Sequence, residues 1–192
     1  MCLKLNLDNF HHKAISDFAL RGEWPEDVLI QTKTLEDGKI LEDGNSDLAF
    51  VTIDGADAKD FDDAIFCERR NKNFILKVAI ADVSFFVKPG SPLDTEAQKR
   101  ATSVYMPKKV LPMIPKKLSN DLCSLVPYQP RRVLVAEIVF DADGELLNYN
   151  FVRTSIRSVA RLTYDEVNDF FTNGFPVEAK FVDSLTQSKI LF

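Results

Sequence analysis

Five aspartates lie within ten residues of one another in the segment FVTIDGADAKDFDDA, which covers residues 50–64: Asp54, Asp57, Asp60, Asp62 and Asp63. Carboxylates held this close repel one another unless they are solvated, paired with bases or neutralised by a bound cation. The apolar runs FVTI before the cluster and AIFC after it are typical of buried strands. The sequence therefore predicts an acidic loop anchored between strands, which is a suitable site for a hard cation.

A second feature with chemical potential is the basic segment between Gln98 and Val133. Its charged residues are eight lysines and arginines and one aspartate, a net charge of +7 within a chain whose net charge is −5: Lys99, Arg100, Lys108, Lys109, Lys116, Lys117, Arg131, Arg132 and Asp121. Tyr105 and Tyr128 lie among these bases, and several prolines favour an extended, irregular chain. Cations for phosphates and rings for bases are what a single-stranded nucleic acid needs, although a solvated basic surface would look the same.

Four interpretations of the acidic loop follow from the residues alone. A calcium loop of the EF-hand type does not match, because the third or fifth ligand position falls on alanine or lysine whichever of the first three aspartates begins the count. A glycosidase pair needs only two carboxylates and leaves the basic segment without a role. A magnesium site for phosphodiester chemistry uses the whole cluster, with Asp54 folding back across Gly55 toward the other aspartates. A solvated acidic turn remains the structural alternative.

Strands and helices must hold both features in place. Alternating apolar residues predict strands near 48–53, 64–69, 74–81, 132–140 and 145–153. Capping signals at Ser91 and in the sequence TYDE, which begins at Thr163, predict helices near 92–102 and 163–171, and shorter helical patterns cover 24–35 and 179–190. We therefore expect an α+β fold, a mainly antiparallel sheet with flanking helices, in which residues 1–46 form a lead-in segment and linker and residues 47–192 form the domain.

Composition limits the functional classes further. With 192 residues, 45% of them hydrophobic, the chain can bury a core of one domain or of one domain with an appendage. Its three cysteines are widely spaced and form no CxxC pair, so the sequence indicates neither a disulfide framework nor a zinc site. No apolar run reaches membrane-spanning length, and the first residues lack the pattern of a secretory signal. These features predict a cytoplasmic protein with no membrane partner.

Five sequence blocks resemble the catalytic domain, called RNB, of the ribonuclease II and ribonuclease R family, and they are most similar to its bacterial ribonuclease R branch. The blocks occur in the family's order and cover about residues 47–171: VTIDGADAKDFDDAIF, VAIADVSFFV, PLDTEAQKRATSVYMP, LSNDLCSL and ARLTYDEV. A weaker likeness surrounds WPEDVL at residues 24–29. The resemblance implies a hydrolytic 3′→5′ exoribonuclease that degrades single-stranded RNA to nucleoside 5′-monophosphates.

The resemblance also implies roles for individual residues. Asp54, Asp60, Asp62 and Asp63 would bind Mg²⁺, for which Mn²⁺ can substitute, and Asp60 and Asp62 would be catalytic, Asp62 most directly. Tyr105 would stack on the 3′-terminal nucleotide. The fifth aspartate occupies a variable slot of the motif.

The blocks cover only the amino-terminal half of the family's catalytic domain, so the resemblance implies an incomplete RNB domain. In the family, the second half supplies an arginine, a glutamate and a second stacking aromatic residue. If the gene is split, the remaining half of the domain is an expected partner. Two alternatives to an active nuclease follow, namely a catalytically inactive RNA-binding fragment and a chain with no stable fold.

Overall fold

The computed structural model describes residues 7–41, 45, 47–174 and 177–191. Contacts group the chain into two compact units, one from residues 1–36 and 84–119 and the other from residues 37–83 and 120–192. We call them unit 1 and unit 2 and describe each by itself. The prediction divides the chain at a single point, into a lead-in, residues 1–46, and a half-domain, residues 47–192. The contacts do not test that division, which stays a prediction.

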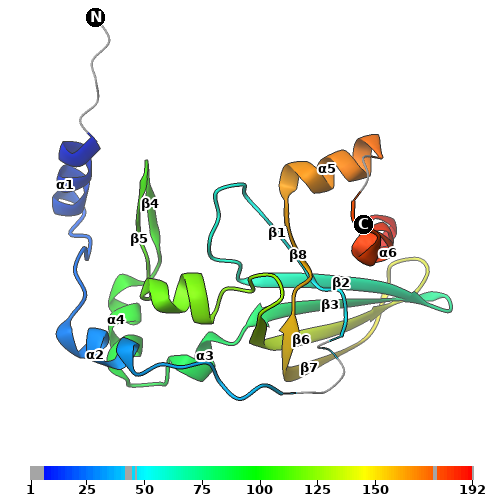
Figure 1. Cartoon of the computed structure of the whole chain (residues 1–192), viewed down its shortest axis with the longest axis horizontal. Helices are drawn as coiled ribbons and strands as arrows, with labels where there is room; N and C mark the ends of the chain where they lie inside the picture. Colours follow the sequence, from blue (N-terminus) through cyan, green and yellow to red (C-terminus); the bar gives the residue numbers. More distant parts are fainter. Residues whose placement is uncertain (1–6, 42–44, 46, 175–176, 192) are drawn as a thin grey trace, which may run out of the picture. The chain divides into compact units, whose positions relative to one another are not determined.

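Unit 2 is built on a six-stranded sheet (Figure 1). In the order β7-β6-β3-β2-β1-β8, its strands are Leu146–Arg157, Pro130–Phe140, Asn73–Ala81, Asp63–Arg70, Val51–Asp54 and Ala160–Thr163. Every pair of neighbours is antiparallel except β1 and β8, which are parallel. The predicted α+β fold with a mainly antiparallel sheet is confirmed.

Local sequence explains most of this sheet. Strand β3 is buried on both faces over most of its length, as its alternating and largely apolar residues predict, whereas Ile80 near its end is exposed. The turn into β3 begins at Asn71, whose φ of 60° is a left-handed conformation that asparagine tolerates. The turn between β6 and β7 contains Gly144 at φ 83°. Strand β7 runs to Arg157, four residues past the predicted end at 153, because its pairing with β6 continues that far.

Two helices of unit 2 pack on the sheet, α5 at Tyr164–Asn173 and α6 at Ala179–Leu191, and both lie above it in Figure 1. Their buried side chains Val167, Phe181 and Leu185 form one cluster with Val51 of β1 and Leu162 of β8. Burial of such side chains is the main stabilising contribution to a domain of this kind. This core cluster therefore includes β1, the strand that leads into the acidic loop.

Unit 1 contains the first helices and a two-stranded hairpin. Its elements are α1 at Leu7–Asp17, α2 at Glu26–Lys33, α4 at Pro92–Arg100, β4 at Val104–Met106 and β5 at Lys109–Leu111. The hairpin was predicted only as an irregular extended segment. It forms because Pro107 lies in the two-residue turn and Pro112 lies just after β5, so neither proline interrupts a strand.

Two short elements lie where the chain passes from one unit to the other: α3 at Val83–Phe86 and the π-helix η1 at Leu118–Leu122. No helix in the described part of the chain is long and apolar enough to cross a membrane.

Removal of the helix cap at Thr163 should weaken unit 2. The Thr163 hydroxyl accepts a hydrogen bond from the Glu166 backbone N–H, and the Glu166 carboxylate accepts one from the Thr163 backbone N–H, which completes the predicted capping box. Thr163→Ala should lower the free energy of unfolding by about 1 kcal/mol in urea titrations. Thr172→Ala, near the other end of the same helix, is the matched control and should change it by less than about 0.5 kcal/mol. Equal effects of the two variants would contradict the capping role.

Candidate active site

The acidic loop joins β1 to β2. Because these strands are antiparallel neighbours, the end of β1 and the start of β2 lie at the same edge of the sheet. Asp54 is the last residue of β1 and Asp63 is the first of β2, while Asp60 and Asp62 belong to the connecting loop. The Ala81 backbone N–H donates to the Asp62 carbonyl oxygen at 2.9 Å. The fold thus gathers the four predicted site aspartates around one loop.

The loop is held at its middle by the segment that follows η1. Phe61 is buried, and its N–H donates to the Ser124 hydroxyl oxygen at 3.1 Å. The same hydroxyl donates to the Lys59 carbonyl oxygen at 3.0 Å, and the Leu125 N–H donates to the Phe61 carbonyl oxygen at 2.8 Å. Three hydrogen bonds around one buried ring therefore define the path of the backbone through the acidic loop.

Arg161 of β8 holds the beginning of the loop. Its Nη2 donates to the carbonyl oxygens of Gly55 and Ala56, at 2.8 and 2.6 Å, and its Cζ lies 5.3 Å from the centre of the Phe61 ring. Its buried Nε has no hydrogen-bond partner within the described residues. Arg161 is also the cation that acts on Asp54, where it lowers the pKa against stronger opposing effects. The side chain is both a clamp and a local counter-charge.

Half of the predicted basic segment is used inside the protein. Arg131 is buried, where its Nε donates to the Ser124 carbonyl oxygen at 3.0 Å and its two Nη atoms pair with Asp37 and Asp121. Three more of the cations donate to backbone carbonyl oxygens of their own unit: Arg100, Lys117 and Arg132. Lys99, Lys108 and Lys116 remain exposed. The basic composition therefore predicted more phosphate-binding cations than the fold leaves available.

The carboxylates of the loop repel one another. The pKa of Asp62 is raised to about 6, by partial burial of its carboxyl group and by the negative charges of Asp60, Asp63 and Asp54. Asp62 as a whole residue is exposed, so the charges of the neighbouring carboxylates act on it alongside the partial burial of its carboxyl group. The pKa of Asp54 is also raised, first by burial and then by the charge of Asp63. A cation in the loop would relieve both effects.

The loop's donor atoms suit a hard divalent cation. They are carboxylate oxygens, which Mg²⁺ prefers, and the buried Oδ2 of Asp54 has no hydrogen-bond partner among the residues that the structure describes. Across the same residues, no three or more His, Cys, Asp or Glu side chains are grouped so as to hold a metal ion. Mg²⁺ commonly binds one or two carboxylates together with water and substrate phosphates, so a closed protein cage is not required. By donor chemistry, the loop fits the ion.

Tyr105 belongs to unit 1, whereas the aspartates belong to unit 2. It is the central residue of β4, pairs with Val110 of β5, and is 68% exposed. Its ring therefore presents a large π-face to solvent, as a stacking residue must.

Sequence reasoning missed three residues that shape the site: Ser124, Arg131 and Arg161. None belongs to the acidic cluster, and Arg131 was placed in the basic segment that was considered for nucleic-acid binding. The blocks LSNDLCSL and ARLTYDEV contain Ser124 and Arg161, so these blocks were the available signal. The pairing of either side chain with the loop, however, cannot be read from the blocks.

Comparisons with known proteins agree with this geometry. The family model of the RNB domain matches residues 44–189. Ribonuclease R of Mycoplasmopsis pulmonis is 44% identical over 88% of this chain, and ribonuclease R of Escherichia coli K12 is 44% identical over 83% of it. The solved structures of Mycoplasma genitalium RNase R, with double-stranded RNA and with ribose-methylated single-stranded RNA, superpose with a TM-score of 0.89 at 35% identity over 96% of this chain.

The chain belongs to the RNB domain family. It spans 25% of the M. pulmonis relative, 21% of the E. coli relative, and 34% and 30% of the two M. genitalium chains. The predicted family is confirmed, and the chain is similar to part of these ribonucleases.

Charge repulsion in the loop should lower the free energy of unfolding at neutral pH. A carboxyl group whose pKa is raised from 3.8 to about 6 on folding binds its proton more tightly in the folded state, so stability falls as pH rises through this window. Asp62→Asn should therefore raise Tm near neutral pH, by about 2–4 °C once solvent screening is discounted, and should not change Tm below about pH 3.5. Calorimetry in EDTA, with Asp57→Asn as control, tests this. Identical melting of wild type and Asp62→Asn at neutral pH would contradict it.

Loss of the Arg161 clamp should loosen the loop and change Asp54. Arg161→Met keeps most of the side chain's apolar stem but removes the donors to Gly55 and Ala56, and the free energy of unfolding should fall by roughly 1–3 kcal/mol. Because a favourable cation is removed, the pKa of Asp54 should rise further. Carboxyl ¹³C NMR titration measures the second effect. Arg157→Met, an exposed arginine at the end of β7 on the opposite edge of the sheet, is the control; it should leave the pKa of Asp54 unchanged and alter the free energy of unfolding by less than about 0.5 kcal/mol.

Proposed function

We propose that this chain provides the acidic, metal-binding half of the active site of a ribonuclease R-like 3′→5′ exoribonuclease, which hydrolyses single-stranded RNA to nucleoside 5′-monophosphates. The observation that carries the proposal is the grouping of four aspartates on one pinned loop, where burial and neighbouring negative charge raise the pKa values of Asp54 and Asp62 and a divalent cation would stabilise the carboxylates. Membership of the RNB family and the RNA complexes of the M. genitalium relative support the choice of substrate.

In this proposal, Asp54, Asp60, Asp62 and Asp63 would hold Mg²⁺, with Mn²⁺ as a substitute. The bound ion would polarise the phosphoryl oxygens and lower the pKa of a water molecule. Asp62 and Asp60 lie in the part of the loop that is fixed by the Phe61 hydrogen bonds, so their carboxylates can keep one orientation during turnover. The scissile bond joins the 5′-phosphorus of the 3′-terminal nucleotide to the O3′ of the nucleotide before it. The water oxygen would bond to this phosphorus, the P–O3′ bond would break, and O3′ would take up a proton and leave as a hydroxyl.

Tyr105 would recognise the RNA end. Its exposed ring can stack on the 3′-terminal base, and stacking tolerates every base because each has a π-face. The exposed Lys108, in the turn of the same hairpin, adds a positive charge for the phosphate backbone. The proposal also includes a cytoplasmic location and, where a second polypeptide supplies it, the remaining half of the catalytic domain as a partner.

A second candidate is a catalytically inactive RNA-binding chain. It is favoured by the short span of the chain relative to its relatives, since groups needed for turnover can lie in the part of those proteins that has no counterpart here. It predicts salt-sensitive binding of single-stranded RNA without release of monophosphates.

A hydrolysis assay separates these functions. The chain is incubated with 3′-labelled poly(A) in Mg²⁺ or in EDTA, and release of labelled 5′-monophosphate is measured. We expect Mg²⁺-dependent release that Asp62→Asn lowers by roughly 100-fold or more while RNA binding persists. Asp57→Asn, an exposed aspartate of the same loop, should keep its activity. Binding without release by wild type would select the inactive chain, and equal turnover by Asp62→Asn would overturn the assignment of Asp62.

A further inference from the structure

The hairpin that carries Tyr105 is too small to hold its own shape. Its strands β4 and β5 have three residues each, and an isolated two-stranded hairpin is at best marginally stable in water. Its turn places Lys108 at φ 60°, a left-handed conformation that is unfavourable for a residue with a long side chain. Contacts from outside the hairpin must therefore stabilise it, and unit 1 provides them at both ends.

At the turn, the contact comes from α1. The Nε2 of His11 lies 2.8 Å from the carbonyl oxygen of Pro107, the first residue of the turn. A carbonyl oxygen can only accept, so Nε2 is the donor. His11 is buried, 7% exposed, whereas its neighbour His12 is exposed. The two adjacent histidines thus lie in different environments.

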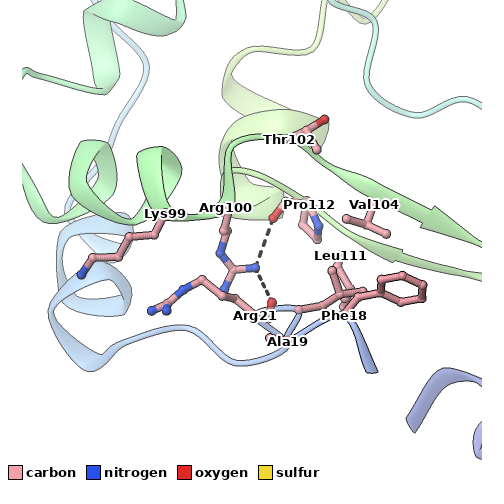
Figure 2. A pocket seen from close by; sticks show the side chains of 10 residues that line it. Phe18, Ala19, Arg21, Lys99, Arg100, Thr102, Val104, Leu111 and Pro112 are labelled. Carbon is pink, nitrogen blue, oxygen red and sulfur yellow. Dashed lines mark hydrogen bonds between the residues drawn. The ribbon is translucent and has the colours of Figure 1, made fainter. Parts of the chain in front are cut away.

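At the base, Arg100 joins both ends of the hairpin to the N-terminal segment (Figure 2). This side chain, just before β4, donates through Nη1 to the carbonyl oxygens of Pro112, just after β5, and of Arg21, at 3.3 and 2.8 Å. Its Nε donates to the buried Glu96 at 2.9 Å, and its Cζ lies 3.5 Å from the centre of the Trp24 ring. Arg100 is thereby held in one orientation by partners on three sides.

Polar contacts matter here because the apolar packing is incomplete. A cavity of about 180 Å³ lies between the N-terminal segment and the hairpin, lined among others by Phe18, Val104 and Leu111. Figure 2 shows the two segments on opposite sides of it. This pocket is partly open to solvent, so its lining faces water rather than other side chains, and apolar contact between the two segments is limited at this place. The hydrogen bonds of His11 and Arg100 bridge the two sides.

We infer that His11 and Arg100 are positioning residues for Tyr105, so that residues 7–24 act as an arm that orients the ring for the 3′-terminal base of RNA. The inference rests on the proposed function, because it concerns how that function recognises its substrate. Neither side chain contacts RNA in this account, and both act through the hairpin.

The test measures RNA affinity by fluorescence anisotropy, with the complete chain and a short oligoadenylate labelled with fluorescein at its 5′ end. EDTA prevents hydrolysis, and the free 3′ end remains available to Tyr105. Tyr105→Ala should weaken binding by about tenfold. His11→Ala should weaken it by about three- to tenfold, and His12→Ala, the matched control, by less than about twofold. His11→Gln should restore binding, since its amide N–H can donate to the Pro107 carbonyl oxygen.

A double variant separates positioning from a general loss of structure. In the Tyr105→Ala background, His11→Ala should cause no further loss, because its effect passes through the ring. Arg100→Lys, which keeps the charge but not the fork of donors, should weaken binding as His11→Ala does, and Lys99→Arg should not. Should wild type and Tyr105→Ala bind equally, the proposed role of Tyr105 fails. A clear loss in Tyr105→Ala without one in His11→Ala, or additive losses in the double variant, would overturn the inference alone.

Discussion

Neighbouring carboxylates repel one another in the acidic loop, and the elements around the loop hold it in place against that repulsion. Four aspartates lie around one short loop, where partial burial of the Asp62 carboxyl group and the negative charges of its neighbours raise the pKa of Asp62 to about 6. A loop free to relax would separate its charges into solvent. Hydrogen bonds to the backbone of the loop prevent this separation, so the carboxylates stay close together and a bound cation would offset their repulsion.

The scaffold that opposes this repulsion is assembled from distant parts of the chain. Ser124 and Leu125 hold Phe61 in the middle of the loop, and Arg161 clamps its beginning. Arg131 in turn supports Ser124, because its Nε donates to the Ser124 carbonyl oxygen. Of the arginines in the basic segment, Arg131 supports this scaffold, Arg100 supports the hairpin of unit 1, and Arg132 donates to the Lys39 carbonyl oxygen. The segment therefore exposes fewer cations than its composition predicts, and these include Lys99, Lys108 and Lys116.

In both units, side chains from other elements hold a segment that would be unfavourable by itself. In unit 2 a loop with unfavourable charge is held by side chains from other elements, and in unit 1 a hairpin with an unfavourable turn is held by His11 and Arg100. Each places its chemically useful group, a carboxylate or an exposed ring, at the edge of a more rigid framework. Such preorganisation reduces the entropy that substrate binding would otherwise cost.

Features that depend on near neighbours along the chain could be predicted from the amino-acid sequence. The period-two pattern of β3, the caps at Ser91 and Thr163, and the turn at Gly144 are local, so they were predictable. The family blocks pointed to the aspartates and Tyr105 as candidate site residues, which stays a prediction. Contacts between groups that are distant along the chain became clear from the folded structure. Strand β8, four residues long and without a periodic signal, pairs in parallel with β1 and brings Arg161 to Gly55, 106 positions away. His11 meets Pro107 across 96 positions. Local patterns report the burial of each residue but not its partner, because closure of the whole chain selects that partner.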